Sequence, residues 1–197
     1  MSIMKVAITG HTKGLGKELY NRFDDVKGFS SSNDYDVSDN YERAKIISEI
    51  DKFDLFINNA HPFFDQTRLL MEVFDKWKYE DKTIVNIISR AKYDNVSKGF
   101  MYAASKASLS HLSHNLRFST DKECRIIDVN PGLLNSDLPS LTYTEMADIV
   151  MWCINQPKHI EVGEISVWNK GPFIKVQEEK EKRISKSEQY SLEDKNK

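Results

Sequence analysis

The amino-acid sequence predicts an α/β fold, in which a mostly parallel, doubly wound sheet of about six strands carries helices on both faces. Two observations lead to this prediction. Short apolar runs alternate with stretches of helical periodicity along nearly the whole chain, which is the pattern of strand–helix–strand units with right-handed crossovers. The first apolar run is also short and closed by glycine, as expected for a buried parallel strand.

The individual elements follow from these runs in chain order. Residues 3–8 form a short apolar strand that stops at Gly10, and the next stretch, 15–23, places Leu15, Leu19 and Phe23 at helical spacing. The remaining predicted elements are a strand at 26–30, a helix at 40–51, a strand at 54–57, a helix at 67–78, a strand at 83–88, a helix at 102–118, a strand at 125–129, a helix at 142–154 and a strand at 164–168.

The length of 197 residues suits one domain, which we place at residues 1–177. The composition changes at about residue 178, since residues 178–197 hold six acidic and six basic side chains and no apolar stripe. We expect this charged tail to be disordered or a frayed helix, with an exposed helix as the alternative.

Charge and cysteine content exclude several classes of protein. The net charge of −2 and the isoelectric point of about 6.2 argue against an electrostatically driven nucleic-acid binder. Cys124 and Cys153 are isolated, which excludes a disulfide scaffold and a cysteine zinc site. No apolar run approaches the roughly 20 residues that span a bilayer, and Met1 to Gly10 does not read as a signal peptide. We therefore expect a cytoplasmic protein that holds no metal and binds neither nucleic acid nor membrane.

A glycine-rich block lies where the first strand turns into the first helix. It reads Thr9, Gly10, His11, Thr12, Lys13, Gly14, Leu15, Gly16. Glycines there permit a tight turn and let the backbone approach a pyrophosphate, while the helix N-terminus offers N–H groups to the same anion. A plain strand–helix turn is the alternative, and the position after the first strand of an α/β pattern makes it the weaker one.

A tyrosine and a lysine stand four residues apart on the helix predicted at 102–118. Tyr102 and Lys106 would share one helical face. A phenol with a pKa near 10 is a poor acid catalyst at neutral pH, but an ammonium beside it stabilises the phenolate and lowers the pKa. Taken alone, such a pair is more often an ordinary feature of a helix surface.

Further motifs occur in a fixed order along the chain. They are Asp36-Val37, Asn58-Asn59-Ala60, Ser89 after the apolar run 84–88 and thirteen residues before Tyr102, and Asn130-Pro131-Gly132 with Ser136 four residues beyond the glycine. Together with the glycine block and the Tyr102/Lys106 pair, this series resembles the classical short-chain dehydrogenase/reductase family, whose patterns are TGxxxGxG, an adenine-side Asp-Val, NNAG, a catalytic serine, YxxxK and PGxxxT. The resemblance covers about residues 3–170 and implies a Rossmann-like fold of a shortened type.

The resemblance implies an NAD(P)-dependent oxidoreductase that transfers a hydride between a nicotinamide cofactor and a carbonyl or secondary alcohol. Tyr102 would be the general acid or base, Lys106 would lower the pKa of Tyr102 and bind the nicotinamide ribose, and Ser89 would donate a hydrogen bond to the substrate oxygen. The residues expected at the cofactor are Thr9, Gly10, Thr12, Lys13, Gly14, Leu15, Gly16, Asp36, Val37, Asn58, Asn59, Ala60, Tyr102, Lys106, Pro131, Gly132 and Ser136.

Two other functions remain open. One is a dinucleotide-binding regulatory or sensor module with little turnover; the other, weaker one is a sugar-nucleotide epimerase or dehydratase, which would usually add a substrate domain. The family resemblance also implies a homodimer or larger assembly through the helices at 67–78 and 102–118.

Three stretches are shorter than the family pattern. Between Gly16 and Asp36 there is no room for another full helix, so the usual third strand or its preceding helix should be reduced. Residues 66–82 contain no asparagine where the family carries a catalytic one, and neither Gln66 nor Thr67 is favoured as its replacement. Few residues follow Ser136 before the next helix, which predicts a short lid and an open site.

Several side chains allow two interpretations. His61 stands in place of the last glycine of NNAG; it is either a loop residue or a residue that faces the cofactor or substrate, and the first is favoured. Arg90, Lys92 and Tyr93 either recognise an anionic substrate or form an exposed basic loop.

We expect NADP to be preferred, with NAD possible. Lys13 precedes the second glycine of the block, where a basic residue of the family often meets the 2′-phosphate. The second strand ends in Phe29 to Ser32 without an acidic residue, and a carboxylate there is what binds the ribose 2′-hydroxyl of NAD. Against this, Asp34 is close enough in sequence to reach the ribose.

Overall fold

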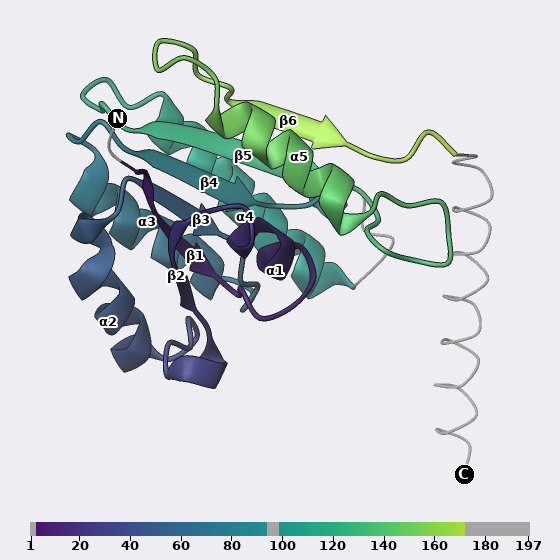
Figure 1. The fold of residues 1–197 in the computed structure, drawn as a ribbon, viewed down its shortest axis with the longest axis horizontal. Coiled ribbons are helices and arrows are strands. Elements are labelled where there is room, and N and C mark those ends of the chain that lie inside the picture. Colours follow the sequence, from purple (N-terminus) through teal and green to yellow (C-terminus); the bar gives the residue numbers. More distant parts are fainter. Residues whose placement is uncertain (1–2, 94–98, 172–197) are drawn as a thin grey trace.

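The protein, described by a computed structural model over residues 3–93 and 99–171, is built on a single six-stranded parallel sheet. The strands are β1 (Lys5–Thr9), β2 (Asp25–Phe29), β3 (Leu55–Asn58), β4 (Thr83–Ile87), β5 (Arg125–Pro131) and β6 (Glu164–Val167). Their order across the sheet is β2-β1-β3-β4-β5-β6, and every neighbouring pair is parallel (Figure 1). The predicted fold class is confirmed.

Five α-helices cover the two faces of this sheet (Figure 1). They are α1 (Gly14–Tyr20), α2 (Asn40–Glu49), α3 (Asp65–Trp77), α4 (Phe100–Arg117) and α5 (Tyr143–Ile154). Helices α1 and α5 pack together on one face, while α3 contacts both α2 and α4 on the other. Short 3-10 turns lie at η1 (Ser31–Asn33), η2 (Ile50–Lys52) and η3 (Arg90–Lys92).

The core is divided into two layers because strand side chains point alternately to the two faces. Val6 and Ile8 of β1 are fully buried in the cluster that includes residues of α1 and α5, whereas Ala7 between them joins the cluster under α2, α3 and α4. Trp77 at the end of α3 is also fully buried in this second cluster. Trp152 on α5 is instead 55% exposed.

The order of the strands reverses at β1, which lies between β2 and β3. In open α/β sheets this switch point creates a crevice outside the carboxyl ends of the strands, where ligands bind. After β2 the chain passes through η1 and α2 and enters β3 on the other side of β1, so β2 is the edge of the sheet. This is the shortening expected from the distance between Gly16 and Asp36.

Most element boundaries lie within two residues of the prediction; the largest difference is at α1, which ends at Tyr20, three residues early. Helix α4 begins at Phe100, two residues early, and β5 continues to Pro131, two residues late. The charged tail at 178–197 lies outside the described residues. No helix within residues 3–93 and 99–171 is long and apolar enough to cross a bilayer, and within the same ranges no cluster of three His, Cys, Asp or Glu side chains could hold a metal ion.

Candidate active site

The glycine block forms a tight turn between β1 and α1. Gly10 and Gly14 have φ angles of +70° and +59°, a region that side chains with a Cβ rarely adopt. A Cβ on Gly16 would lie 2.1 Å from the Gly10 carbonyl oxygen and 2.5 Å from Asn59 Nδ2. The turn therefore packs directly on the end of β3 and requires glycine at position 16.

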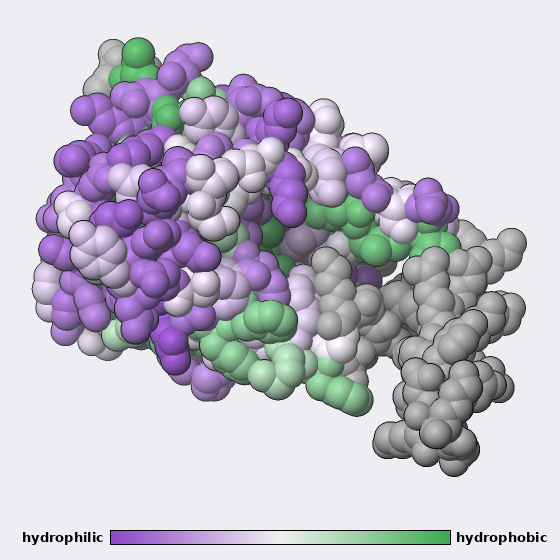
Figure 2. Space-filling view, turned by 90° about the horizontal axis from the view of Figure 1, so that it is seen from below, coloured by the Kyte–Doolittle hydropathy of each residue, from purple (hydrophilic) through white to green (hydrophobic). Residues whose placement is uncertain are grey.

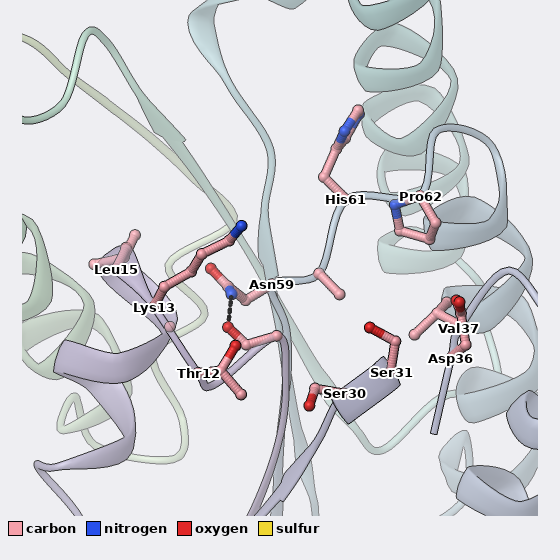
Figure 3. A pocket seen from close by; sticks show the side chains of 13 residues that line it. Thr12, Lys13, Leu15, Ser30, Ser31, Asp36, Val37, Asn59, His61 and Pro62 are labelled. Carbon is pink, nitrogen blue, oxygen red and sulfur yellow. Dashed lines mark hydrogen bonds between the residues drawn. The ribbon is translucent and has the colours of Figure 1, made fainter. Parts of the chain in front are cut away.

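A pocket of about 370 Å³ opens at the switch point, beside this turn (Figure 3). Its lining residues are Gly10, Thr12, Lys13, Leu15, Gly16, Ser30, Ser31, Asp36, Val37, Asn59, Ala60, His61 and Pro62. The list brings together four segments that the sequence separates: the glycine block, the end of β2, the Asp36-Val37 pair and the Asn59-Ala60 pair with the two residues that follow it.

Thr9 and Asn59 hold the floor of this pocket together. The Thr9 hydroxyl accepts hydrogen bonds from the backbone N–H groups of Asn59 and Ala60, each at 3.0 Å. Asn59 Nδ2 donates to the carbonyl oxygens of Thr9 and Gly10 at 3.1 Å, and a dashed line in Figure 3 marks one of these hydrogen bonds. Thr9 itself is fully buried, so its part is to join the ends of β1 and β3 beneath the pocket.

The far side of the pocket is formed by η1 and the segment after it. Ser30 caps η1, accepting from the Ser32 N–H at 3.3 Å, and Ser31 lines the pocket. Hydrogen bonds from the Ser38 hydroxyl and backbone N–H lower the pKa of the Asp36 carboxyl, which also lines the pocket. The lining residues include Asp36 and not Asp34, so Asp36 is the acidic side chain on this side.

The exposed Lys13 side chain extends toward Asn59, whereas Ser31 and Asp36 lie across the pocket from it (Figure 3). This orientation places the ammonium on the side of the glycine turn. The Lys13 ammonium therefore does not lie beside η1, where it would have to be to contact a 2′-phosphate as expected from the sequence.

Tyr102, in the first turn of α4, is half-buried. Burial raises the pKa of its phenol above the usual value of 10.0, and a hydrogen bond with Ser89 offsets part of this effect. Ser89, at the end of β4, also accepts the Ala91 N–H at 3.1 Å, which begins η3. The structure thus brings the predicted serine and tyrosine into contact.

Lys106 is turned into the protein and is only 3% exposed. Its Nζ donates to Gln66 Oε1 at 2.8 Å and to the Ile87 carbonyl oxygen at 2.9 Å, and it lies 5.8 Å from the centre of the Tyr102 ring. In this geometry burial of the phenol, and not the nearby ammonium, sets the direction of the Tyr102 pKa shift.

Gln66 is the residue that sequence reasoning left undecided. It is 1% exposed, and its Nε2 donates to the carbonyl oxygens of Asn58 at 2.8 Å and Ile87 at 3.2 Å. Thr67, the alternative, has a buried hydroxyl without a hydrogen-bond partner in the described part of the chain. A signal was present in the sequence: Gln66 is the polar member of an otherwise apolar stripe with Leu69 and Leu70.

From Gln66 a chain of buried polar groups continues beneath α4. Asn58 Nδ2 donates to Asn86 Oδ1 at 3.1 Å, and Asn86 Nδ2 donates to Asp128 Oδ1 at 3.0 Å. Arg117 Nη2 then contacts Asp128 Oδ2 at 2.8 Å. Burial raises the pKa of the Asp128 carboxyl, although the Arg117 charge and the hydrogen bonds oppose that shift. No sequence argument had singled out Asp128 or Arg117.

His61 lies between the pocket and Tyr102. It lines the pocket, its ring centre is 4.6 Å from that of Tyr102, and its Nε2 lies 3.2 Å from the Ser105 hydroxyl. Phe63, which has a strained φ of +48°, packs its ring 5.2 Å from the imidazole. His61 therefore lies in a loop, as favoured, and this loop places it at the edge of the pocket.

The end of β5 forms a separate wall. Gly132 is packed against Trp168, because a Cβ on Gly132 would lie 2.8 Å from Trp168 Cβ. The Arg90 guanidinium stacks on the same indole ring, 3.9 Å from its centre. Pro131, Gly132 and Ser136 are absent from the residues that line the pocket at the switch point, and Lys92 and Tyr93 both contact Glu164.

The family model described as short chain dehydrogenase matches residues 54–146. An uncharacterised oxidoreductase of Staphylococcus aureus strain N315 is 26% identical over 94 residues, which are 43% of this chain and 41% of that protein. A similar oxidoreductase of Staphylococcus saprophyticus is also 26% identical over 94 residues, 43% of this chain and 40% of its own length. The match thus spans about two fifths of these relatives.

Solved structures show the same fold at low sequence identity. An alcohol dehydrogenase from Thermococcus sibiricus, complexed with 5-hydroxy-NADP, superimposes with a TM-score of 0.71 at 15% identity over 86% of this chain and 98% of its own. Serine dehydrogenase from Escherichia coli gives a TM-score of 0.66 at 20% identity over 84% and 97%. Taken with the matching family model and the similar oxidoreductases, the ordered motifs lead to one conclusion: residues 54–146 are similar to the short chain dehydrogenases, and the described chain has the fold of short-chain dehydrogenase/reductase structures.

Proposed function

We propose that the protein transfers a hydride between NADP and a carbonyl or secondary alcohol, with Tyr102 as the general acid or base. The observation that carries this proposal is the direct connection between the pocket and the phenol. His61 lines the pocket and contacts the Tyr102 ring, and Tyr102 in turn is hydrogen-bonded with Ser89.

The residues present fit a dinucleotide. The turn at Gly10 and Gly16 leaves no room for a Cβ at position 16, so the backbone itself forms the wall that a pyrophosphate would approach. Asp36 and Val37 close the opposite end of the pocket, where the adenosine would lie. The predicted cofactor residues Thr9 and Asn58 are fully buried beneath this surface and would support it without touching the cofactor.

The preference for NADP rests on the end of β2. Ser31 lines the pocket, and the strand ends in Phe29-Ser30 without a carboxylate. A hydroxyl can donate to a 2′-phosphate, whereas a carboxylate there would bind the 2′-hydroxyl of NAD. Lys13 in its present orientation would serve the pyrophosphate, which both cofactors share.

When bound, the cofactor supplies or accepts the hydride. Tyr102 would protonate the carbonyl oxygen in reduction, and Ser89 would donate a hydrogen bond to the same oxygen as negative charge develops. Because burial raises the Tyr102 pKa, the phenol holds its proton at neutral pH. The free site is therefore ready for reduction.

One observation favours the second candidate, a dinucleotide-binding module with little turnover. Lys106 Nζ is held by Gln66 and the Ile87 carbonyl oxygen, 5.8 Å from the centre of the Tyr102 ring. Binding of a cofactor would have to draw the ammonium toward the ribose for the enzyme to reach full activity.

A pair of measurements separates the two candidates. NADPH binding is measured by calorimetry, and NADPH oxidation is followed by absorbance with a panel of aldehydes, ketones and diketones. Binding together with turnover that Tyr102→Phe abolishes supports the enzyme. Binding without turnover of any carbonyl in the panel supports the module, and absence of NADP and NAD binding removes both.

A further inference from the structure

Each reduction removes one proton from Tyr102, and that proton has to be replaced from water. The polar chain that begins at Lys106 leads inward and not to the surface. Gln66 is 1% exposed, and Asn58, Asn86 and Asp128 are each fully buried. Three of these four groups are carboxamides, which donate and accept hydrogen bonds but do not titrate near neutral pH. The Lys106 side of Tyr102 is therefore a poor route for a proton.

The other side of Tyr102 faces an imidazole. The rings of His61 and Tyr102 lie 4.6 Å apart with an angle of 56° between their planes. His61 is half-buried and borders the open pocket, so one edge of its ring can meet water. Among the described residues that line this pocket, His61 carries the one side chain whose ordinary pKa is close to neutral.

Helix α4 fixes the orientation of the imidazole. The Ser105 hydroxyl donates its hydrogen to the Tyr102 carbonyl oxygen at 2.8 Å. Its oxygen is then the acceptor for His61 Nε2–H at 3.2 Å. The charged side chains of the same pocket are Lys13 and Asp36, and Lys106 is the charged group on α4 next to the phenol. A small rotation of the imidazole, or one bridging water, joins it to the phenol.

We propose that His61 carries the proton between water and Tyr102 in each catalytic cycle. The inference rests on the proposed role of Tyr102. In reduction the hydride pair reaches the carbonyl carbon, the carbonyl oxygen takes the proton of Tyr102, and a tyrosinate remains. The imidazolium of His61 then gives its proton to the tyrosinate and recovers one from water. In the direction of alcohol oxidation the same proton leaves by the same route.

The first test needs neither cofactor nor substrate. In protein labelled with ¹³C at Cζ of tyrosine, the hydrogen–deuterium exchange of the Tyr102 hydroxyl is followed by the isotope shift in NMR, with Tyr102→Phe to assign the signal. We expect His61→Gln and His61→Phe to slow this exchange at least about tenfold. Phe keeps an aromatic ring at position 61, and Gln keeps a hydrogen-bonding group there. Slower exchange in both variants would therefore be due to the one property that both lack, an imidazole nitrogen that gains and loses a proton. His111→Gln, on the exposed face of α4, should leave exchange unchanged.

Two exchange results would overturn the proposal. One is equal exchange in wild type and both His61 variants. The other is slower exchange in Gln66→Leu, because that result would place the route on the Lys106 side.

The second test separates this proposal from the function on which it rests. NADPH and excess 2,3-butanedione are mixed with enzyme in a stopped-flow instrument. We expect His61→Gln to complete its first turnover at the wild-type rate, because Tyr102 starts protonated, and later turnovers to be at least about tenfold slower. Imidazole in the buffer should restore the later turnovers of His61→Ala. A slow first turnover of His61→Gln, or no rescue of His61→Ala by imidazole, contradicts the role of His61 as proton carrier. A wild-type protein that turns over no carbonyl contradicts the proposed function instead, and the exchange experiment then decides on His61.

Discussion

Tyr102 is half-buried, and the direction of its pKa shift gives a prediction about pH. Its pKa is raised because burial disfavours the phenolate more than the hydrogen bond with Ser89 favours it. The proton required for reduction is therefore present at neutral pH and is lost only as the pH rises through the raised pKa. We expect kcat/KM for carbonyl reduction to show no loss assignable to Tyr102 between pH 7 and 9, and Tyr102→Phe to lower it by about a hundredfold or more.

The corresponding control is cofactor affinity, which Tyr102→Phe should leave nearly unchanged because the hydroxyl acts on the substrate oxygen. A kcat/KM that falls between pH 7 and 9 in wild type but not in a His61 variant would place the titrating group at His61 and not at Tyr102. An active Tyr102→Phe protein would refute the assignment of the acid.

Gln66 is predicted to be a positioning residue for Lys106. Lys106 Nζ donates to Gln66 Oε1 at 2.8 Å and to the Ile87 carbonyl oxygen. Gln66→Leu removes the first of these two acceptors and keeps the second. An unsatisfied buried polar group costs about 1–3 kcal/mol, and the free energy of unfolding should fall by about that amount in denaturant titrations. We also expect kcat to fall about tenfold with little change in KM, since without Gln66 the ammonium would no longer be held beside Tyr102, the position from which a bound cofactor would draw it toward the ribose.

Thr67→Val is the matched control, because the neighbouring Thr67 hydroxyl is buried without a hydrogen-bond partner among the described residues. Wild-type stability in Gln66→Leu would mean that Lys106 finds another acceptor at no cost, and the positioning role would be lost.

Individual site residues were predictable where a short motif fixes them and not where packing does. Thr9, Asn59 and Gly16 belong to patterns that specify one backbone turn, and the structure brings them together at the pocket. The contact between His61 and Tyr102 joins residues 41 positions apart, and no local spacing reports it. Gln66 contacts Lys106 across 40 positions, and the local sign of this contact is a polar side chain on an apolar helix face.

At the scale of elements, the inner strands β1, β3, β4 and β5 were predictable because most of their residues are buried on both faces and form short apolar runs, whereas the edge strands β2 and β6 are only partly buried. The ends were harder. Residues Asn130 and Pro131 extend β5 beyond the apolar run because they pair with Ser166 and Val167 of β6, and this pairing is not visible locally.

The turn after β2 yields a prediction on cofactor choice. Ser31 lines the pocket, so Ser31→Glu places a carboxylate where the 2′-phosphate of NADP would lie. Repulsion between two anions should lower the affinity for NADP at least about tenfold, or ~1.4 kcal/mol, while the affinity for NAD is kept or improved. Titrations of both cofactors by calorimetry measure the ratio.

Lys13→Ala serves as the comparison for this experiment. Since Lys13 extends toward Asn59 (Figure 3), its removal should weaken NADP and NAD by a similar factor and leave their ratio unchanged. A ratio that moves with Lys13 and not with Ser31 would transfer the 2′-phosphate contact to the lysine.

The contact between α4 and β5 gives a prediction on stability. Asp128 is fully buried and accepts from Arg117, Ser113 and Asn86. Asp128→Ala leaves the Arg117 guanidinium without its carboxylate, and breaking a buried pair in this way costs about 3–5 kcal/mol. Lys158→Ala, which breaks the exposed contact with Asp81, should cost less than about 1 kcal/mol. Denaturant titrations of the two variants test the contrast, and equal losses would contradict it.

For the whole molecule, the pocket lies at the switch point of the sheet and is bounded at one end by the edge of the sheet. With β2 as the last strand, η1 and the Asp36-Val37 segment close that end. In the view of Figure 2 most of the described surface is hydrophilic, with apolar side chains gathered along one edge and around a hollow. A molecule of this composition does not need a partner to bury its core, so any assembly must be argued from particular exposed side chains.

The outer face of α3 and α4 is where we predict that two copies of the chain associate. Met71 on α3 and Met101 on α4 are 38% and 61% exposed, and the small Ala107 lies exposed on the same helix as Met101, which would allow two helices to approach closely. Sedimentation equilibrium at micromolar concentration should give about twice the chain mass of 22.8 kDa. Ala107→Glu would bury two carboxylates in the interface and should return the protein to a monomer, while Tyr41→Glu on the exposed side of α2 should not. A single species of 22.8 kDa in the wild type would contradict this association, because the apolar side chains of α3 and α4 would then remain exposed to solvent in a monomer.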